Sequence, residues 1–251
     1  MTYDTPAGFD DTWALTESVD GWMTHAQGGR LWTAAGRVAP GGQIVEIGSF
    51  RGRSMIVLSR AAPAAGSIVA IDPHAGNDRG PQEIDGYADA AALDHEVFNR
   101  NLERAGVRDR VTHVRAFSSD AHDRVDGPID LLYIDGAHRY GPARDDIRSW
   151  GDRVPTGGTM LIHDSFSSIG VTLAIGRELV TSGRWRYEGR SGSLTQYHRE
   201  PLRGRARVRN ALEQLKQLPW FARNVLIKVL ITVRLGRVTR LFGHDPSVWP
   251  Y

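Results

Sequence analysis

The stretch IDLLYIDGAHRYGPARDDIRSWGDRVPTGGTMLIHD, residues 129–164, decides the fold. It contains two short, mainly apolar runs, 129–134 and 159–162, that do not alternate with polar residues, as is typical of strands buried inside a parallel sheet. Residues 140–150 between them predict a crossover helix that ends before Pro155. A strand–helix–strand unit of this length predicts two parallel strands in one sheet, with their carboxyl ends at the same edge.

Four polar side chains follow these two strands. Asp135 and His138 come after the first strand, and His163 and Asp164 come after the second. Because the carboxyl ends of parallel strands share one edge of the sheet, we expect the four side chains to converge there. In open α/β sheets this edge binds the ligand, so the stretch predicts a functional site as well as a fold.

The rest of the chain alternates strands and helices around this central unit. Further strands are expected at 43–47, 67–71 and 111–115, helices at 53–62, 89–105, 119–125 and 169–182, and a terminal hairpin at 185–187 and 194–198. The whole predicts an α/β fold: a doubly wound, mostly parallel seven-stranded sheet with an antiparallel hairpin at its C-terminal end. Residues 73–88 have few apolar side chains and many turn formers, which predicts a loop over the edge of the sheet.

Charge divides the chain into unequal parts. Residues 203–251 carry ten Lys and Arg against two acidic residues, a net charge of +8, whereas residues 1–202 carry a net charge of −6. We therefore expect three units: an N-terminal helical cap at 1–40 with a helix at 28–38, the sheet domain at 41–202, and the basic helical extension at 203–251. The small overall charge of +2 thus hides an acidic body and a basic tail.

Composition excludes several classes of protein. The chain has no cysteine, so disulfides and thiolate zinc sites are excluded. No window of about 18 residues is apolar and free of charge, and the first residues lack the apolar segment of a secretory signal. These features predict a cytoplasmic protein, and its hydrophobic content of 41% is ordinary for a globular one.

A glycine-rich turn at 48–52 joins the strand at 43–47 to the helix at 53–62. The free N–H groups and the dipole of a helix N-terminus suit an anionic ligand group. The spacing is G-x-x-x-G rather than the G-x-G-x-x-G of dinucleotide enzymes, so a simple tight turn is the alternative. Asp72 follows the next strand, where it is positioned to accept both hydroxyls of a ribose; alternatively, it caps the turn at Pro73.

Five sequence blocks, taken in order, resemble a known enzyme family. They are VEIGSFRGRS (45–54), AIDPH (70–74), AFSSD (116–120), LLYIDGAHRY (131–140) and GGTMLIHD (157–164). The set is similar to the class I S-adenosylmethionine-dependent methyltransferases. More narrowly, it resembles the metal-dependent O-methyltransferases, which include macrolide-sugar methyltransferases and, more distantly, catechol O-methyltransferase. The resemblance spans about residues 20–200.

This resemblance implies a role for each matching residue. For the cofactor, it implies that the methionine part is held by Glu46, Gly48, Ser49 and Ser54, the ribose by Asp72 and the adenine by Ser118. It also implies that Asp135 borders the cofactor and, together with His163 and Asp164, binds a divalent cation (Mg²⁺ or Mn²⁺). The general base that it implies is His138. A histidine suits a base, since its unperturbed pKa is about 6.5. The alternative for His138 is a local cap of the turn.

One position of the implied cation site departs from the family pattern. At His163 the family usually offers a carboxylate or an amide, and an imidazole suits Mn²⁺ better than Mg²⁺. The alternative is that His163 orients a ligand or a water instead of binding the cation. Asp145 and Asp146 lie inside the predicted crossover helix, where we expect a solvated face or local pairs.

Three functions follow from the sequence. The resemblance implies an O-methyltransferase that acts on a hydroxyl of a small molecule, such as a sugar, glycan or other polyol. A nicotinamide-dependent oxidoreductase is the second, disfavoured by the glycine spacing and by the metal-type ligands at the edge of the sheet. The third is a non-catalytic, membrane-recruited protein that keeps a nucleotide-binding body.

The basic tail predicts two helices, at 208–218 and 218–235, separated at Pro219. On a helical projection its cationic residues gather on one side of the second helix, opposite Leu226, Val229, Leu230 and Val233. One alternative is that the apolar face packs on the body or forms a homodimer interface. The other is that it docks on an anionic membrane, in which case the protein would lie at the inner membrane surface. Nucleic-acid binding is disfavoured because no recognition fold accompanies the arginines.

Overall fold

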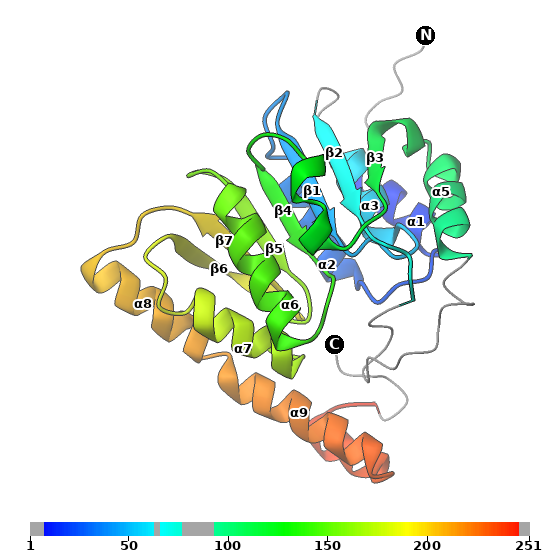
Figure 1. Ribbon diagram of the computed structural model, residues 1–251. Helices are drawn as coiled ribbons and strands as arrows, with labels where there is room; N and C mark the ends of the chain where they lie inside the picture. Colours follow the sequence, from blue (N-terminus) through cyan, green and yellow to red (C-terminus); the bar gives the residue numbers. More distant parts are fainter. Residues whose placement is uncertain (1–7, 63–65, 77–92, 246–251) are drawn as a thin grey trace.

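The computed structural model describes residues 8–62, 66–76 and 93–245. Its centre is a seven-stranded sheet with the strand order β3-β2-β1-β4-β5-β7-β6 (Figure 1). The strands are β1 (Gln43–Ile47), β2 (Ser67–Ile71), β3 (Val111–Val114), β4 (Leu131–Ile134), β5 (Thr159–Ile162), β6 (Trp185–Ser191) and β7 (Leu194–Arg199). The first five are parallel, and β7 and β6 complete the sheet as antiparallel strands. The predicted fold class is therefore confirmed.

Helices cover both faces of the sheet. They are α1 (Phe9–Thr16), α2 (His25–Ala35), α3 (Arg53–Ala61), α5 (Asp94–Arg104), α6 (Tyr140–Asp145), α7 (Ile169–Glu178), α8 (Gly204–Leu215) and α9 (Leu218–Thr232). One apolar core joins the sheet to α2, α3 and α5, and a second joins the other face to α6 and α7. Neighbouring strand residues such as Ile44 and Val45 belong to opposite cores, which explains why the parallel strands are apolar on both faces.

Strand register brings the predicted functional positions together. Ile47 of β1 lies beside Ile134 of β4, and Ile134 lies beside Ile162 of β5. The residues that follow these three strands therefore leave the sheet at the same level. The hydrogen bonding between neighbouring strands continues one residue past the strand ends. The Asp135 N–H donates to Ile47 O at 2.8 Å, and the His163 N–H donates to Ile134 O at 2.9 Å.

The crossover helix differs from the predicted one. After α6 the chain makes a π-helical turn at Asp146–Trp150 and a 3₁₀ turn at Gly151–Arg153. A π-helical turn changes which side chains face inward, and here Asp146, Ile147 and Trp150 are all buried. The expectation that Asp146 is solvated was therefore wrong.

Other boundaries moved by a few residues. The N-terminal helix runs from His25 rather than Gly28, because Thr24 and Gln27 form a reciprocal cap at its start. Helix α1 was not predicted. Two 3₁₀ turns, Ser118–Asp120 and His122–Arg124, replace the helix predicted at 119–125. Most of the predicted loop at 73–88, and residues 89–92 of the helix predicted at 89–105, lie outside the described residues.

The basic tail forms α8, α9 and a 3₁₀ segment, Gly236–Phe242. Figure 1 shows α8 and α9, in orange, following one another along the side of the molecule that carries α7. Helix α8 is joined to β6 by Asn210, whose side chain accepts the Tyr187 N–H at 2.7 Å and donates to Trp185 O at 3.0 Å. Within the described ranges, no helix combines the length and the hydropathy needed to cross a bilayer.

Candidate active site

A pocket of about 1090 Å³ opens at the carboxyl ends of the parallel strands. This volume is at the upper end of the range for ligand pockets, about 300–1,000 Å³. Nine of the ten predicted site residues line it: Gly48, Ser49, Ser54, Asp72, Ser118, Asp135, His138, His163 and Asp164. The tenth, Glu46, lies beneath the wall of the pocket, where it is fully buried.

The glycine-rich turn passes very close to the neighbouring strand end. Gly48 has a φ of +86°, and a Cβ on this residue would lie 2.1 Å from Asp135 O. Both the left-handed conformation and the contact exclude other residues. This approach lets the β1 turn and the residues after β4 form one continuous wall of the pocket.

Asp72 supports that turn directly. One carboxylate oxygen accepts the N–H groups of Ser49 and Phe50 at 2.9 and 2.8 Å, and the other accepts the His74 N–H at 2.7 Å. The contact with His74 corresponds to the alternative that Asp72 caps the turn at Pro73. The carboxylate thus orders the loop, and it also lies on the pocket wall.

Glu46 is a buried acid with an elevated pKa. Burial raises the pKa of Glu46 to about 8, although hydrogen bonding to nearby serines acts in the opposite direction. The Ser54 hydroxyl donates to one carboxyl oxygen, and the other oxygen, Oε2, is buried with no protein partner. Such an orphaned oxygen next to a pocket is a position where a ligand donor can be accommodated.

Asp146 is a site residue that sequence reasoning missed. It lines the pocket near Ser118, and it is only 5% exposed. Burial raises the pKa of Asp146 to about 6, against the effect of a hydrogen bond from Ser118. The only sequence signal was a pair of adjacent aspartates, and the π-helical turn that points the second one inward is not readable from periodicity.

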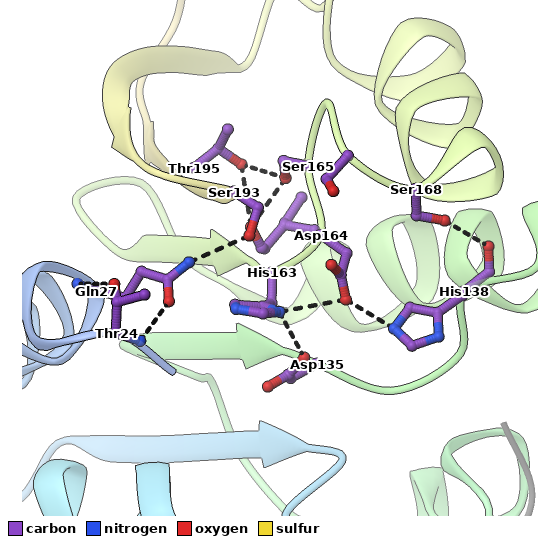
Figure 2. Close-up of polar contacts among 12 residues, drawn as sticks. Thr24, Gln27, Asp135, His138, His163, Asp164, Ser165, Ser168, Ser193 and Thr195 are labelled. Atoms are coloured by element: carbon purple, nitrogen blue, oxygen red, sulfur yellow. Dashed lines mark hydrogen bonds and ion pairs between the residues drawn. The ribbon is translucent and has the colours of Figure 1, made fainter. Parts of the chain in front are cut away.

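The four polar side chains predicted to converge do so, and we name them the Asp–His cluster: Asp135, His138, His163 and Asp164 (Figure 2). His163 Nδ1 lies 3.1 Å from Asp135 Oδ1 and 3.3 Å from Asp164 Oδ2. His138 Nε2 lies 2.7 Å from the same Asp164 oxygen. The Tyr133 hydroxyl donates to the other oxygen of Asp135 at 2.7 Å.

Electrostatics in the cluster favour ionised carboxylates. Burial alone would raise the pKa of Asp164, but the charge of His163 and the hydrogen bonds from both histidines hold it well below its usual range. Burial alone would lower the pKa of His163, but Asp135 and Asp164 raise it well above its usual value. Since an ionised carboxylate only accepts hydrogen bonds, His138 Nε2 donates to Asp164, and His138 Nδ1 carries the lone pair.

The loop after β5 has a strained backbone. Asp164 and Phe166 have φ values of +55° and +56°, a conformation that costs non-glycine residues of order 1–3 kcal/mol each. On one side, Ser165 is held by hydrogen bonds to Ser193 and Thr195 of the terminal hairpin (Figure 2). These contacts fix the direction in which Asp164 points.

Helix α9 holds the same loop from the other side. Asn224 donates to Phe166 O at 3.3 Å, and Lys228 donates to Ser167 O at 3.0 Å and to its hydroxyl at 3.2 Å. The helix and the residue that follows it also contribute five residues to the pocket wall: Val225, Lys228, Val229, Thr232 and Val233. Nothing in the sequence indicated that the basic tail forms part of the site.

Comparison with known proteins gives a match to a family model and matches to curated proteins. Residues 45–165 match the family model described as a methyltransferase domain. Over 150 residues the chain is 25% identical to the uncharacterized protein y4gI of Sinorhizobium fredii. That match covers 57% of this chain but 15% of the relative, so the chain spans only a small part of that protein.

Solved structures share the fold at low sequence identity. The O-methyltransferase TomG from Streptomyces achromogenes, involved in tomaymycin synthesis and solved with S-adenosylmethionine, is 20% identical with a TM-score of 0.51, over 79% of this chain and 91% of that chain. The methyltransferase PaMTH1 from Podospora anserina, solved with S-adenosylhomocysteine, is 15% identical with a TM-score of 0.54, over 76% of this chain and 87% of that chain.

Three independent observations now agree. The sheet with its antiparallel terminal pair is the one that the family resemblance implied, the pocket lies at the carboxyl ends of the strands, and the matched region contains the glycine-rich turn and the Asp–His cluster. The match to a methyltransferase domain thus covers residues 45–165, just under half of the chain, and the fold is one that the chain shares with solved methyltransferases.

Proposed function

We propose that the protein is a divalent-cation-dependent O-methyltransferase that methylates a hydroxyl of a sugar, glycan or other polyol. The observation that carries this proposal is the Asp–His cluster, in which a three-residue cation ligand set and a carboxylate-oriented histidine adjoin the glycine-rich turn in one pocket. O-methyltransferases recur among the solved structures with this fold, which supports an oxygen acceptor.

The cofactor end of the pocket is proposed from position and polarity. S-Adenosylmethionine, when bound, supplies an electrophilic methyl group on a sulfonium. We assign its methionine part to Gly48, Ser49 and Ser54, with Glu46 acting from beneath through its buried carboxyl group. We assign the ribose to Asp72, which would accept hydroxyls in addition to the N–H groups that it already binds. The adenine is assigned to Ser118, next to the buried Asp146.

The cluster fits a divalent cation. One ligand atom from each of Asp135, His163 and Asp164 lies within 4.8 Å of the others, and two of these side chains are buried. Carboxylate oxygens suit Mg²⁺ and Mn²⁺, and the imidazole of His163 favours Mn²⁺ once the cation has displaced its proton. A cation held by these residues would lower the pKa of an acceptor hydroxyl and fix its orientation.

His138 is the proposed general base. Its Nε2–H group donates to Asp164, which fixes the ring orientation and leaves the Nδ1 lone pair to accept the acceptor's hydroxyl proton. A bound S-adenosylmethionine would supply the methyl group to the acceptor oxygen and leave as a neutral thioether, while His138 would hold the proton taken from the hydroxyl. The strained loop after β5 holds Asp164, and through it His138, in this geometry.

A labelled-methyl transfer screen tests this function. The full-length protein is incubated with methyl-labelled S-adenosylmethionine and with glycans, phenols and hydroxylated lipids, each with Mg²⁺, with Mn²⁺ or with a chelator. We expect cation-dependent label in a hydroxyl-bearing acceptor, released as a methyl ether on product analysis. Label transferred only to nitrogen or carbon atoms, or full activity in the chelator, would overturn the proposed chemistry.

A further inference from the structure

Helix α9 is fixed to the body by one face. Ile227 and Asn224 are fully buried or nearly so, and Trp220 and Phe221 pack against the second apolar core. The guanidinium of Arg190 lies over the Trp220 ring, 3.8 Å from its centroid. The helix therefore presents a defined opposite face to solvent.

That opposite face is apolar. Leu218, Leu226, Val229 and Val233 are between 42% and 54% exposed. At 100° per residue these four side chains fall within an arc of about 80°, and we name them the α9 stripe. Beyond the helix, Leu241 is 84% exposed. The side chains that pack on the body belong to a different face of α9 from the apolar face predicted from the sequence. A contiguous exposed apolar strip of this kind marks an interaction surface.

The α9 stripe continues into the active-site pocket. Val229 and Val233 belong both to the exposed stripe and to the pocket lining. Val225 and Thr232 line the pocket on the next side of the helix, and Lys228 reaches the loop that carries Asp164. An apolar chain lying on the stripe could therefore enter the pocket without crossing a polar rim on this wall.

The charge of this segment has one sign. Residues 214–244 contain six Lys or Arg and no Asp or Glu. Arg234, Arg237 and Arg240 are exposed near the end of the stripe. Basic side chains beside an apolar helical face match an anionic lipid surface, whose headgroups attract the charges while the apolar side chains enter the interface.

We propose that α9 and the segment after it rest on an anionic lipid bilayer, so that the pocket receives an amphiphilic acceptor, a lipid or lipid-linked molecule with a hydroxylated head group, along the α9 stripe. The acceptor part of this proposal rests on the proposed O-methyltransferase function. The docking part does not, because it concerns a surface outside the Asp–His cluster.

Vesicle flotation tests the docking part without any cofactor. The full-length protein is mixed with neutral phosphatidylcholine vesicles or with vesicles that contain phosphatidylglycerol, at low and high salt. We expect binding that rises with anionic lipid content and falls with salt. Leu226→Asp and Leu241→Asp should each weaken vesicle binding by about tenfold or more, because a leucine side chain that would enter the lipid interface is replaced by a charged carboxylate. Leu173→Asp, at a leucine on α7 whose exposure of 57% lies between those of Leu226 and Leu241, is the matched control and should bind like the parent.

The outcomes separate the possible occupants. Absent binding, or equal binding to neutral and anionic vesicles, overturns the proposal. A dimer in sedimentation velocity that Leu226→Asp converts to a monomer would assign the stripe to a second copy of the chain instead. For the acceptor part, methyl transfer to a hydroxylated lipid in vesicles should exceed transfer to its free head group at least about tenfold. Equal rates would contradict the acceptor part of the proposal. A failure of all methyl transfer would contradict the proposed function but would not affect the conclusion from flotation.

Discussion

Replacing His138 by alanine is expected to lower turnover by about 10²- to 10⁴-fold while S-adenosylhomocysteine affinity stays near normal. The side chain lines the pocket, and its Nε2 donates to Asp164 in the loop after β5. Removing the ring therefore removes the proton acceptor without removing a cofactor contact. Steady-state kinetics and calorimetry measure the two quantities on the same preparation.

The pH profile gives this prediction a second readout. Burial alone would lower the pKa of His138, but the hydrogen bond and charge of Asp164 outweigh it and raise the pKa. Because a base acts in its neutral form, turnover should rise with pH as His138 loses its proton. This rise should vanish in His138→Ala and persist in His198→Ala, a matched change on β7 outside the pocket. Unchanged turnover in the His138 variant would leave this residue with a structural role.

Loss of a cation ligand is the second large effect that we expect. Asp135→Asn and Asp164→Asn should each lower cation-supported activity by about 10²- to 10⁴-fold, the equivalent of several kcal/mol of lost electrostatic stabilisation. Chelation should inactivate the parent enzyme, and Mn²⁺ or Mg²⁺ should restore it. Neither variant should recover, whereas Asp123→Asn, an exposed change in a 3₁₀ turn, should behave like the parent.

Cation binding can also be measured without any activity assay. Mn²⁺ titration calorimetry on the cofactor-free protein should give one site in the parent and in Asp123→Asn, and a greatly weakened site in the other two variants. Both ligand variants also remove a carboxylate that faces the buried His163, so their melting temperatures must be measured before rates are compared. A parent protein that binds no divalent cation would contradict the assignment, whatever the kinetics of the variants.

The convergence of the Asp–His cluster was predictable because it follows from a few local sequence patterns taken together. Two short apolar runs joined by a helical segment specify parallel neighbours, and parallel neighbours in register place Asp135 and His163 side by side. The glycine-rich turn was predictable for a similar reason, since Gly48 must accommodate the close approach of the Asp135 backbone. In both cases the residue type and the strand end determine the position.

What could not be predicted depends on contacts between distant segments. The inward position of Asp146 results from a π-helical turn that also buries Trp150, and helical periodicity in the sequence does not predict such a turn. The left-handed conformation of Asp164 and Phe166 is held by the terminal hairpin and by α9. The part that α9 plays in the pocket is likewise a tertiary fact, because the same amphipathic pattern allows either face to pack on the body.

The roles assigned to Asp72 and Glu46 show how one residue can serve both fold and site. Asp72 already accepts three backbone N–H groups, so its replacement would disturb the glycine-rich turn as well as any ribose contact. Glu46 is buried behind Ser54, and one of its carboxyl oxygens has no protein partner. Affinity losses in variants of either residue therefore need a measurement of stability beside them.

The most direct measurement is the thermal shift that each candidate cofactor produces. A ligand that binds only the native state at 100 times its Kd stabilises it by about 2.7 kcal/mol, which corresponds to a rise in Tm of roughly 5–10 °C for a chain of this size. We expect S-adenosylhomocysteine to raise the melting temperature of the full-length protein by this amount and NAD to leave it unchanged. A rise with NAD and none with S-adenosylhomocysteine would contradict the assignment of the pocket to a methyltransferase cofactor.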